Sequence, residues 1–337
     1  MNDVKNMADE SMLFTVSPSP HLRHGDTTRS IMTDVIIALI PAFIWGVICF
    51  GLRALAVVAL SVGSAIFFEY GIQKILKKNI TIRDGSASLT GLLLGLSLPT
   101  SVPYFMPVVG SFFAIVIVKQ LFGGIGKNFM NPALAARVFL FAWPGEMIRF
   151  TEPFKRLGFF ASNKAIDAIS TATPLGSLKE GVLPDIAWGD LIIGRSGGSI
   201  GEVSSVLLIV GGLYLLVRKV ISWHIPVSFI GTVALLAAIF PQNEDTVAFI
   251  FSQLFAGGLI LGAFFMATDY VTSPITNKGK LIFGAGCGMI VIFIRYFGGY
   301  PEGVSFAILI MNSLVYYIDK ITKPRAFGKS RRGAKHG

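Results

Sequence analysis

Residues 31–51 read IMTDVIIALIPAFIWGVICFG and contain a single charged side chain, Asp34. An apolar run of this length can cross the hydrocarbon core of a membrane, about 30 Å thick, as one α-helix. The rest of the chain has a similar character, because 53% of its 337 residues are hydrophobic and only 14% are charged, against about 25% charged in soluble domains. The sequence therefore predicts an all-α integral membrane protein.

Ten apolar segments are candidates for membrane-spanning helices. They are residues 31–51, 54–74, 88–98, 104–122, 132–144, 203–217, 225–240, 247–266, 281–297 and 303–318. The third and fifth segments are too short to cross as regular helices. The predicted organisation is a cytoplasmic N-terminal segment (1–30), a first membrane repeat (31–144), a connection (145–202), a second membrane repeat (203–318) and a basic tail (319–337).

The basic residues predict the orientation of the chain. Seven of the 29 Lys and Arg residues fall in the last 18 positions, directly after an apolar run. Lys and Arg also occupy the connections at 75–87, 218–224 and 267–280. Because cytoplasmic connections are enriched in Lys and Arg, both termini are predicted to be cytoplasmic and residues 145–202 extracytoplasmic. The basic tail favours contact with anionic lipid headgroups, and this pattern argues against nucleic acid as a partner.

The two halves of the chain share landmarks. The pentad GLLLG at 91–95 recurs 167 positions later as GLILG at 258–262, and Thr/Ser/Pro-rich interruptions follow at 99–103 and 268–274. Five spans is an odd number, so a duplicated half enters the membrane from the other side. These landmarks predict a 5+5 inverted repeat with discontinuous helices. The alternative is that Gly and Pro are simply common in membrane helices, where Gly permits close approach.

Several kinds of redox site are excluded from this polypeptide. Its only cysteines, Cys49 and Cys287, lie in apolar runs, whereas iron–sulfur clusters need about four thiolates. We interpret both cysteines as small buried hydrophobes; the alternative is a cysteine shared with a partner subunit. The chain also lacks a phosphate-binding GxxxxGK[ST] motif and a GxGxxG motif in a strand–turn–helix context. A nicotinamide site is therefore not expected here.

Residues 167–175 read DAISTATPL and lie in the long connection. A residue before proline is held extended, and Ser and Thr hydroxyls hydrogen-bond to the local backbone, so composition alone favours a turn. The same extended geometry would present the hydroxyl of Thr173 outward among small neighbours. That arrangement suits the substrate of a modifying enzyme.

Five motifs in order along the chain give it a family resemblance. They are SPSPHLR (17–23), TTRSIMTDV (27–35), NPALAARVF (131–139), DAISTATPL (167–175) and YPEGVSFAILIMN (300–312). Together they resemble the D subunit of Rnf-type electron-transport complexes (RnfD), and the chain is also similar to the larger B subunit of the sodium-pumping NADH:quinone reductase (NqrB). The short length and the first motif favour RnfD.

The resemblance implies that FMN is joined through its phosphate to Thr173 by a separate flavin transferase on the extracytoplasmic side. Asp167 and Ser170 belong to the same cofactor-binding motif, and Asp167 is expected to assist recognition. Many relatives have Gly at the position of Thr171, but the acceptor, the Ala and the Pro are all in place. A second, noncovalent flavin, riboflavin, is also consistent with the resemblance.

The resemblance further implies electron transfer between reduced ferredoxin and NAD⁺, coupled to Na⁺ or H⁺ export across a bacterial or archaeal cytoplasmic membrane. Other subunits would hold the ferredoxin, NAD⁺ and iron–sulfur sites. A 5+5 inverted repeat alone would equally suit a stand-alone channel or secondary transporter. A third alternative is a membrane scaffold without a cofactor.

Charged residues in or near the spans are candidates for an ion path, because a charge in the membrane is costly. Asp34, Lys119 and Arg295 lie near predicted span ends and are expected to snorkel toward water. Glu69 and Arg137 suit either an ion path or buried pairs.

Asp269 is a different case, because it lies at the predicted break after the eighth span. Unwound carbonyl groups and a carboxylate at such a break can bind Na⁺ or H⁺. Asp269 is therefore the predicted ion ligand of this chain.

Overall fold

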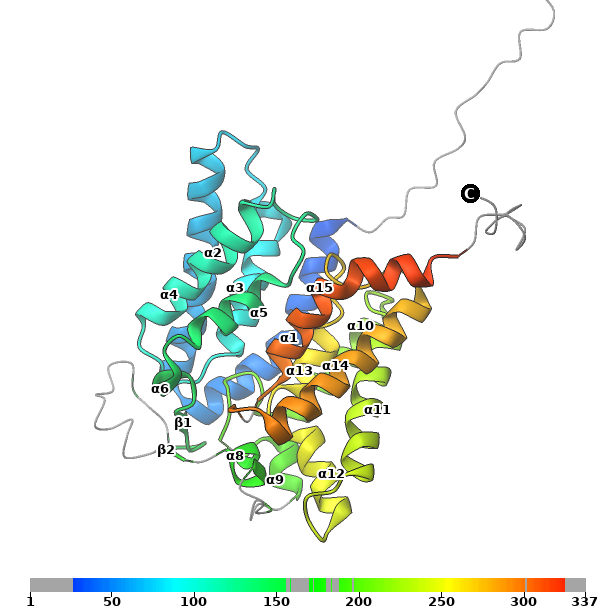
Figure 1. The fold of residues 1–337 in the computed structure, drawn as a ribbon. Helices are drawn as coiled ribbons and strands as arrows, with labels where there is room; N and C mark the ends of the chain where they lie inside the picture. Colours follow the sequence, from blue (N-terminus) through cyan, green and yellow to red (C-terminus); the bar gives the residue numbers. More distant parts are fainter. Residues whose placement is uncertain are drawn as a thin grey trace, which may run out of the picture.

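A computed structural model describes residues 27–155, 158, 170–171, 173–179, 183, 188–195, 197–300 and 302–324. Residues 1–26, the tail from 325 onward, and Asp167 of the DAISTATPL motif lie outside the described residues. Helices make up most of the described chain (Figure 1). The prediction of an all-α membrane protein is confirmed.

The first repeat consists of five helical elements. They are α1 (Thr28–Phe50), α2 (Leu52–Ile75), α3 (Ser86–Leu96), α4 (Phe105–Phe112) continued by the π-helix η2 (Phe113–Gln120), and α5 (Pro132–Leu140). A short 3-10 turn, η1 (Ile82–Asp84), precedes α3. Each element coincides with one of the first five predicted spans.

The second repeat also consists of five elements. They are α10 (Ser205–Val217), α11 (His224–Ile239), α12 (Thr246–Phe255) followed by α13 (Leu259–Leu261) and the π-helix η3 (Gly262–Met266), α14 (Asn277–Phe297), and α15 (Val304–Thr322). These coincide with the other five predicted spans. α15 extends beyond the predicted end at 318, into the segment that we expected to belong to the tail.

The connection between the repeats contains short elements only, as far as it is described. They are α6 (Pro144–Met147), β1 (Phe150–Thr151), β2 (Ser170–Thr171), α8 (Pro174–Lys179) and α9 (Trp188–Ile193). β1 and β2 are antiparallel, with Phe150 opposite Thr171 and Thr151 opposite Ser170.

Polar side chains fix where several helices begin. The side-chain oxygens of Thr27, Asn131 and Thr276 accept backbone N–H groups from the first turns of α1, α5 and α14. These N–H groups have no partner within the helix, so such caps stabilise the first turn by about 1 kcal/mol each.

Four helices are long and apolar enough to cross a membrane: α1, α2, α14 and α15. α12 and α13–η3 together form a fifth candidate, bent by 56° at a short break. Large apolar side chains point outward from the bundle, for example Phe67, Phe293 and Val217, which are 64 to 81% exposed. An apolar exterior of this kind needs a nonpolar surrounding such as lipid.

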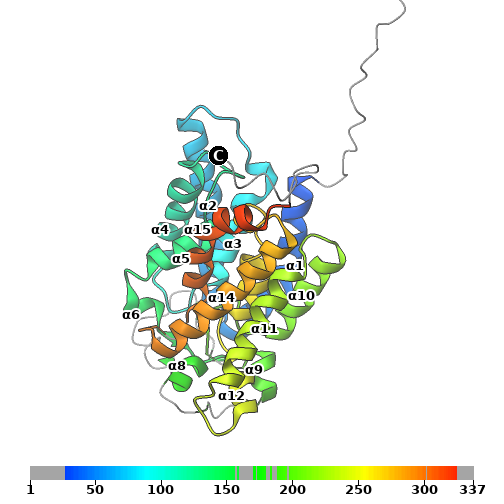
Figure 2. The same ribbon diagram turned by 45° about the vertical axis from the view of Figure 1, so that its right-hand side comes forward.

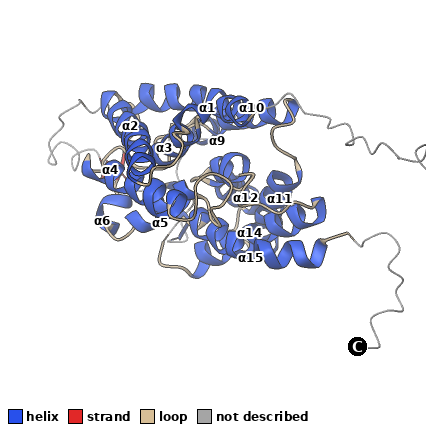
Figure 3. Cartoon of the chain, turned by 90° about the horizontal axis from the view of Figure 1, so that it is seen from above, coloured by secondary structure: helices blue, strands red, loops and turns tan. Residues whose placement is uncertain are grey.

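The two repeats pack internally in the same way. The second element of each contacts the third and the fourth: α2 packs on α3 and α4, and α11 packs on α12 and α14. Between the repeats, α1 packs on α10 and α5 packs on α15 (Figure 3). The first elements of the two repeats are thus in contact, and so are the last elements. Contacts between corresponding elements are expected when the two halves are related by a two-fold axis.

The position of the helix break differs from the prediction. We expected discontinuities after the third and eighth spans, at 99–103 and 268–274. The described bent pair is interrupted instead inside the eighth span, at residues 256–258, where Gly257 has a φ of 74°. Residues 268–274 form a loop after η3. The left-handed φ of the break is open to glycine, whereas the Thr, Ser and Pro residues of 268–274 rarely adopt it.

Both described chain ends lie at one end of the bundle. The start of α1 and the end of α15 are on the same side as the connection between α2 and α3, while α6, α8 and α9 lie at the opposite end (Figures 1 and 2). The relative placement of the termini and the long connection therefore agrees with the charge pattern.

The first glycine of the GLLLG pentad allows α3 to approach α2 closely. A Cβ atom on Gly91 would lie 2.7 Å from Val62 Cα and 2.8 Å from Ser61 O. We therefore expect Gly91→Ala to lower the free energy of unfolding by about 1–3 kcal/mol through overpacking, measured as thermal unfolding in detergent. Gly71→Ala in α2 is the matched control, since no atom lies within 4 Å of its added Cβ. Equal stability of the two variants would contradict this account.

Candidate functional site

Thr173 is positioned by the start of α8. Its Oγ1 accepts the backbone N–H of Gly176 at 3.1 Å, and its carbonyl accepts the N–H of Ser177 at 3.1 Å. The predicted hydrogen bond between a hydroxyl and the local backbone is therefore present, as the cap of a short helix. The Thr173 side chain is only half-buried. A Cβ atom added to Gly176 would lie 3.4 Å from Thr173 Oγ1. Glycine at this position therefore leaves space beside the hydroxyl.

α8 is anchored to the membrane bundle. Leu175 and Leu178 are buried, and Leu175 lies directly against Gly257 at the helix break. Lys179 Nζ donates to the carbonyl of Gly298, at the end of α14, at 2.6 Å. These contacts hold Thr173 at a fixed place on the end of the bundle.

Ser170 is placed by the strand pair. It stands in β2 opposite Thr151, whose hydroxyl lies 2.6 Å from that of Thr100 after α3. The structure thus brings Ser170 and Thr173 to the same end of the bundle. The recognition role of Asp167 and the place of Ser170 in the cofactor site stay predictions.

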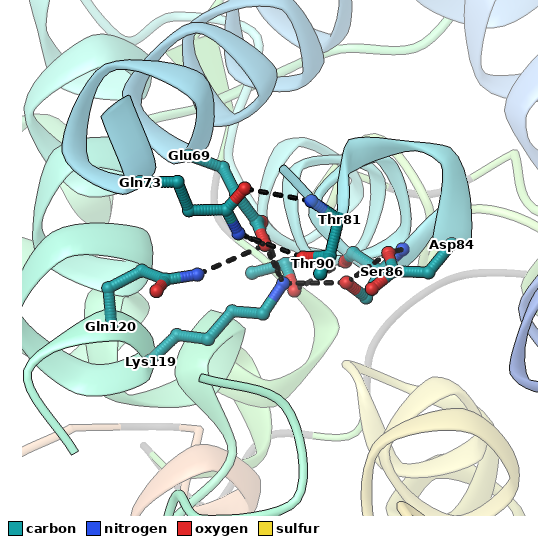
Figure 4. Close-up of polar contacts among 8 residues, drawn as sticks. All are labelled: Glu69, Gln73, Thr81, Asp84, Ser86, Thr90, Lys119 and Gln120. Carbon is teal, nitrogen blue, oxygen red and sulfur yellow. Dashed lines mark hydrogen bonds and ion pairs between the residues drawn. The ribbon is translucent and has the colours of Figure 1, made fainter. Parts of the chain in front are cut away.

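A buried polar cluster surrounds Glu69 in the first repeat (Figure 4). Lys119 Nζ lies 2.7 Å from Glu69 Oε2 and 3.0 Å from Oε1, and it donates to Ser86 Oγ at 2.6 Å. The amide groups of Gln73 and Gln120 each donate to Glu69 Oε1 at 3.1 Å. Both charges are therefore paired and hydrogen-bonded, as buried charges must be. Lys119 is 3% exposed, so the expectation that it snorkels is wrong.

Arg137 is the centre of a second buried cluster. Its guanidinium contacts Glu302, and its Nη1 lies 3.2 Å from Glu202 Oε1. Nη2 also donates to Ser199 Oγ at 3.4 Å. One guanidinium therefore serves two carboxylates. Of the two alternatives for Glu69 and Arg137, the structure shows buried pairs. Glu69 pairs with Lys119, and Arg137 pairs with Glu202 and Glu302.

Arg295 does not snorkel either, since it is 4% exposed. Its Nη1 donates to the carbonyl and to Oε1 of Gln253, at 2.5 and 2.8 Å. Gln253 stands 167 positions after Ser86, and the same offset relates the two glycine pentads. Ser86 is the corresponding partner of Lys119. Lys119 and Arg295 both stand on the fourth element of their repeat, and each contacts the third element, so they are corresponding buried cations.

Asp34 has a side chain that is only 13% exposed, and it is paired with the more exposed Arg218. Its Oδ2 is 3.1 Å from Arg218 Nη2, and its Oδ1 accepts the hydroxyl of Tyr214 at 3.0 Å. This pair joins α1 to the end of α10, the first helices of the two repeats. It is an inter-repeat contact between charged side chains at the bundle surface.

Asp269 lines a cavity between the two repeats. The cavity is partly open to its surroundings. Its polar lining includes Asn128, Asn131, Thr90 and Asp269, and its apolar wall includes Phe265. Burial raises the pKa of Asp269, while hydrogen bonds from Thr272 and from the backbone of Val271 and Tyr270 offset part of this rise.

A conventional metal centre is absent from the part of the chain that the structure describes. No three His, Cys, Asp or Glu side chains there lie close enough to hold one ion. Asp269 would therefore have to bind a cation with hydroxyl, carbonyl or water oxygens, which are suitable ligands for hard cations.

Comparison with known proteins identifies the family. The family model described as "NQR2, RnfD, RnfE family" matches residues 15–328. This chain belongs to that family. The match covers nearly the whole chain and includes all five sequence motifs, so the resemblance noted from the sequence is confirmed.

Three relatives of this family member carry names that differ in the translocated ion. The D subunit of the Na⁺-translocating ferredoxin:NAD⁺ oxidoreductase complex of Acetobacterium woodii is 48% identical over 94% of this chain and 96% of its own length. The D subunit of the proton-translocating ferredoxin:NAD⁺ oxidoreductase complex of Clostridium ljungdahlii is 44% identical over 95% and 97%. The D subunit of the ion-translocating oxidoreductase complex of Escherichia coli is 37% identical over 94% and 99%.

Sequence reasoning missed the partner residues of the buried charges in this family member: Gln73, Ser86, Gln120, Ser199, Glu202, Gln253 and Glu302. A signal existed for two of them. Glu302 stands in the YPEG motif, and Gln253 follows from the 167-residue offset. Glu202 and Ser199 gave none, because they close a long polar connection and look like ordinary surface residues there.

Proposed function

We propose that this chain is the D subunit of an ion-translocating ferredoxin:NAD⁺ oxidoreductase and carries FMN in phosphoester linkage to Thr173. Full-length relatives bearing this subunit name support the assignment to such a complex. The observation that carries the linkage is the half-buried Thr173, whose hydroxyl caps α8. α8 lies at the end of the bundle opposite the chain ends (Figure 1).

The residues around Thr173 fit a tethered flavin phosphate. The hydroxyl stands at the start of a helix fixed by Leu175 and Lys179, with Gly176 leaving space beside it. FMN supplies the electron chemistry when attached. The protein's part is to hold the attachment point in place, and a covalent link keeps the flavin at a high local concentration at an exposed site.

The proposed orientation places Thr173 on the extracytoplasmic side and both termini in the cytoplasm of a bacterial or archaeal cell. The distribution of Lys and Arg supports it, and the bundle has α8 and the chain ends at opposite ends (Figure 1). A flavin transferase would act on the outer side. Electrons would arrive from partner subunits that hold the iron–sulfur and nucleotide sites.

Mass spectrometry of the denatured subunit tests the linkage. The protein is produced with its flavin transferase, and ultraviolet fluorescence of the denatured gel band is followed by fragmentation of the peptide covering 165–179. We expect an FMN-sized mass on Thr173. A fluorescent band without that mass would show that the flavin is attached to another residue. An unmodified protein would leave two alternatives, a transporter or a cofactor-free scaffold.

The cavity between the repeats is the site that we propose for a second, noncovalent flavin, riboflavin. Ligand sites are typically concave and mostly apolar, with a few placed polar groups. Phe264, Phe265 and Leu93 line it with apolar surface, while Thr90 and Asn128 contribute polar groups. Such side chains suit a flat heteroaromatic ring with hydrogen-bonding edges.

Asp269 at the wall of this cavity is the residue that we propose to bind the transported cation. We expect Asp269→Asn to abolish most of the Na⁺ or H⁺ dependence of turnover in the assembled complex, because a neutral amide binds cations far more weakly than a carboxylate. The measurement is activity against cation concentration, with FMN on Thr173 and acid-released flavin quantified in the same preparation. Asn243→Ala, in the connection at 241–246, is the control. An unchanged cation dependence would remove Asp269 as a ligand.

A further inference from the structure

The second buried cluster lies directly beneath the helix that follows Thr173. Leu175 packs against Gly257 at the break between α12 and α13. The next residue, Gly258, packs on Glu202, because a Cβ atom there would lie 2.5 Å from Glu202 Oε1. The break therefore has α8 on one side and the Glu202 carboxylate on the other.

Glu202 is incompletely paired in this position. Its side chain is 2% exposed, and Oε1 accepts from Arg137. Oε2 is buried without a hydrogen-bond partner among the described residues. A buried ionised carboxylate with an unsatisfied oxygen is unfavourable, whereas a protonated carboxyl has no such charge to stabilise.

The charges that face Glu202 come from three other segments. Arg137 of α5 binds it, Glu302 before α15 shares the same guanidinium, and Arg295 of α14 lies beside the break with its donors directed to Gln253 and Ala256. Across the shared guanidinium, the negative charge of Glu302 disfavours ionisation of Glu202.

The electrostatics agree with this geometry. Burial and the neighbouring Glu302 carboxylate raise the pKa of Glu202 to about 7, although the Arg137 guanidinium and the Ser199 hydroxyl oppose the rise. The raised pKa favours the neutral form of this carboxyl more than in a free glutamate. Added negative charge nearby would favour the neutral form further.

We propose that Glu202 is a proton-binding site that takes up a proton when the flavin on Thr173 is reduced and releases it on reoxidation. The inference rests on the proposed function. When the flavin gains an electron from a low-potential donor through the partner subunits, a proton from the aqueous phase forms an O–H bond with a Glu202 carboxylate oxygen. When the flavin passes the electron on, that O–H bond breaks and the proton returns to water.

A redox titration of the covalent flavin tests the proposal in the assembled complex, with dithionite as the reductant. In the native complex the flavin potential should fall with pH just above neutrality, and Glu202 should contribute up to about 59 mV per pH unit for one proton per electron. Glu202→Gln should lose that contribution. Glu152→Gln, an exposed carboxylate beside β1, is the control and should titrate like the native complex.

A second measurement does not depend on how well the variant folds. In the native complex, the infrared difference spectrum between reduced and oxidised states should show a protonated carboxyl band appearing on reduction and shifting in D₂O. The mass of the Thr173 peptide is measured on the same sample. Flavin present with no carboxyl band and with identical pH dependence in Glu202→Gln would overturn the proton site alone. Absence of the flavin from Thr173 would overturn the proposed function together with this inference.

Discussion

Thr173→Val should eliminate covalent FMN from the subunit, so that neither in-gel flavin fluorescence nor an FMN-sized mass remains on the 165–179 peptide. Valine has nearly the shape of threonine but no oxygen that could form a phosphoester. The effect on attachment is therefore expected to be complete. Electron transfer through the assembled complex should fall to background as well, because the complex would lack the flavin that is tethered to this subunit.

Two further substitutions separate loss of the acceptor from loss of the helix cap. Thr173 Oγ1 also caps α8 by accepting from Gly176, and losing such a cap costs about 1 kcal/mol. Thr173→Asn retains a good cap without an acceptor hydroxyl, so we expect native-like stability and no flavin. Thr173→Ser retains both, so flavin should remain. Covalent FMN on Thr173→Asn at the native level would show that the attachment lies on another residue.

The positions of the spans could be predicted because membrane helices share a simple physical property, a long apolar run. The ends of α1, α2 and α14 fall within a few residues of the predicted limits. Thr173 is proposed as the attachment residue because of a family resemblance, since composition alone favoured a turn there. Its helix-capping role agrees with Pro174 at the first helical position, where proline is favoured.

The positions of the buried charges could not be predicted in the same way. Lys119 and Arg295 stand near span ends, where a long side chain can usually reach water. Whether it does so depends on which partners the fold brings near it, and Glu69 and Gln253 are respectively 50 and 42 residues away in sequence. The helix break at Gly257 was missed for a similar reason. An apolar segment rich in Gly suggests close helix packing, and the contact with Glu202 that distinguishes the break is formed only in the folded chain.

Glu69 and Lys119 form a buried ion pair. Each is expected to be essential for stability, because it neutralises the buried charge of the other. The Lys119 ammonium donates to both Glu69 oxygens and to Ser86, and at 3% exposure Lys119 has almost no contact with solvent. Removing one partner leaves an uncompensated charge in a medium of low polarity. Such single deletions typically cost about 3–5 kcal/mol, whereas replacing both charges with apolar or neutral groups of similar volume is often tolerated.

We therefore expect Glu69→Gln and Lys119→Met each to lower the stability of the subunit by about 3–5 kcal/mol, and the double variant to recover most of the loss. Thermal unfolding of the four proteins in detergent gives the coupling free energy of the pair as a double-mutant cycle. Lys127→Met, an exposed lysine in the connection before α5, is the control and should be neutral. Additive losses in the double variant would mean that the two charges are not energetically coupled. A stable Glu69→Gln variant with altered ion transport would instead place Glu69 on the ion path, the role that its position in the membrane first suggested.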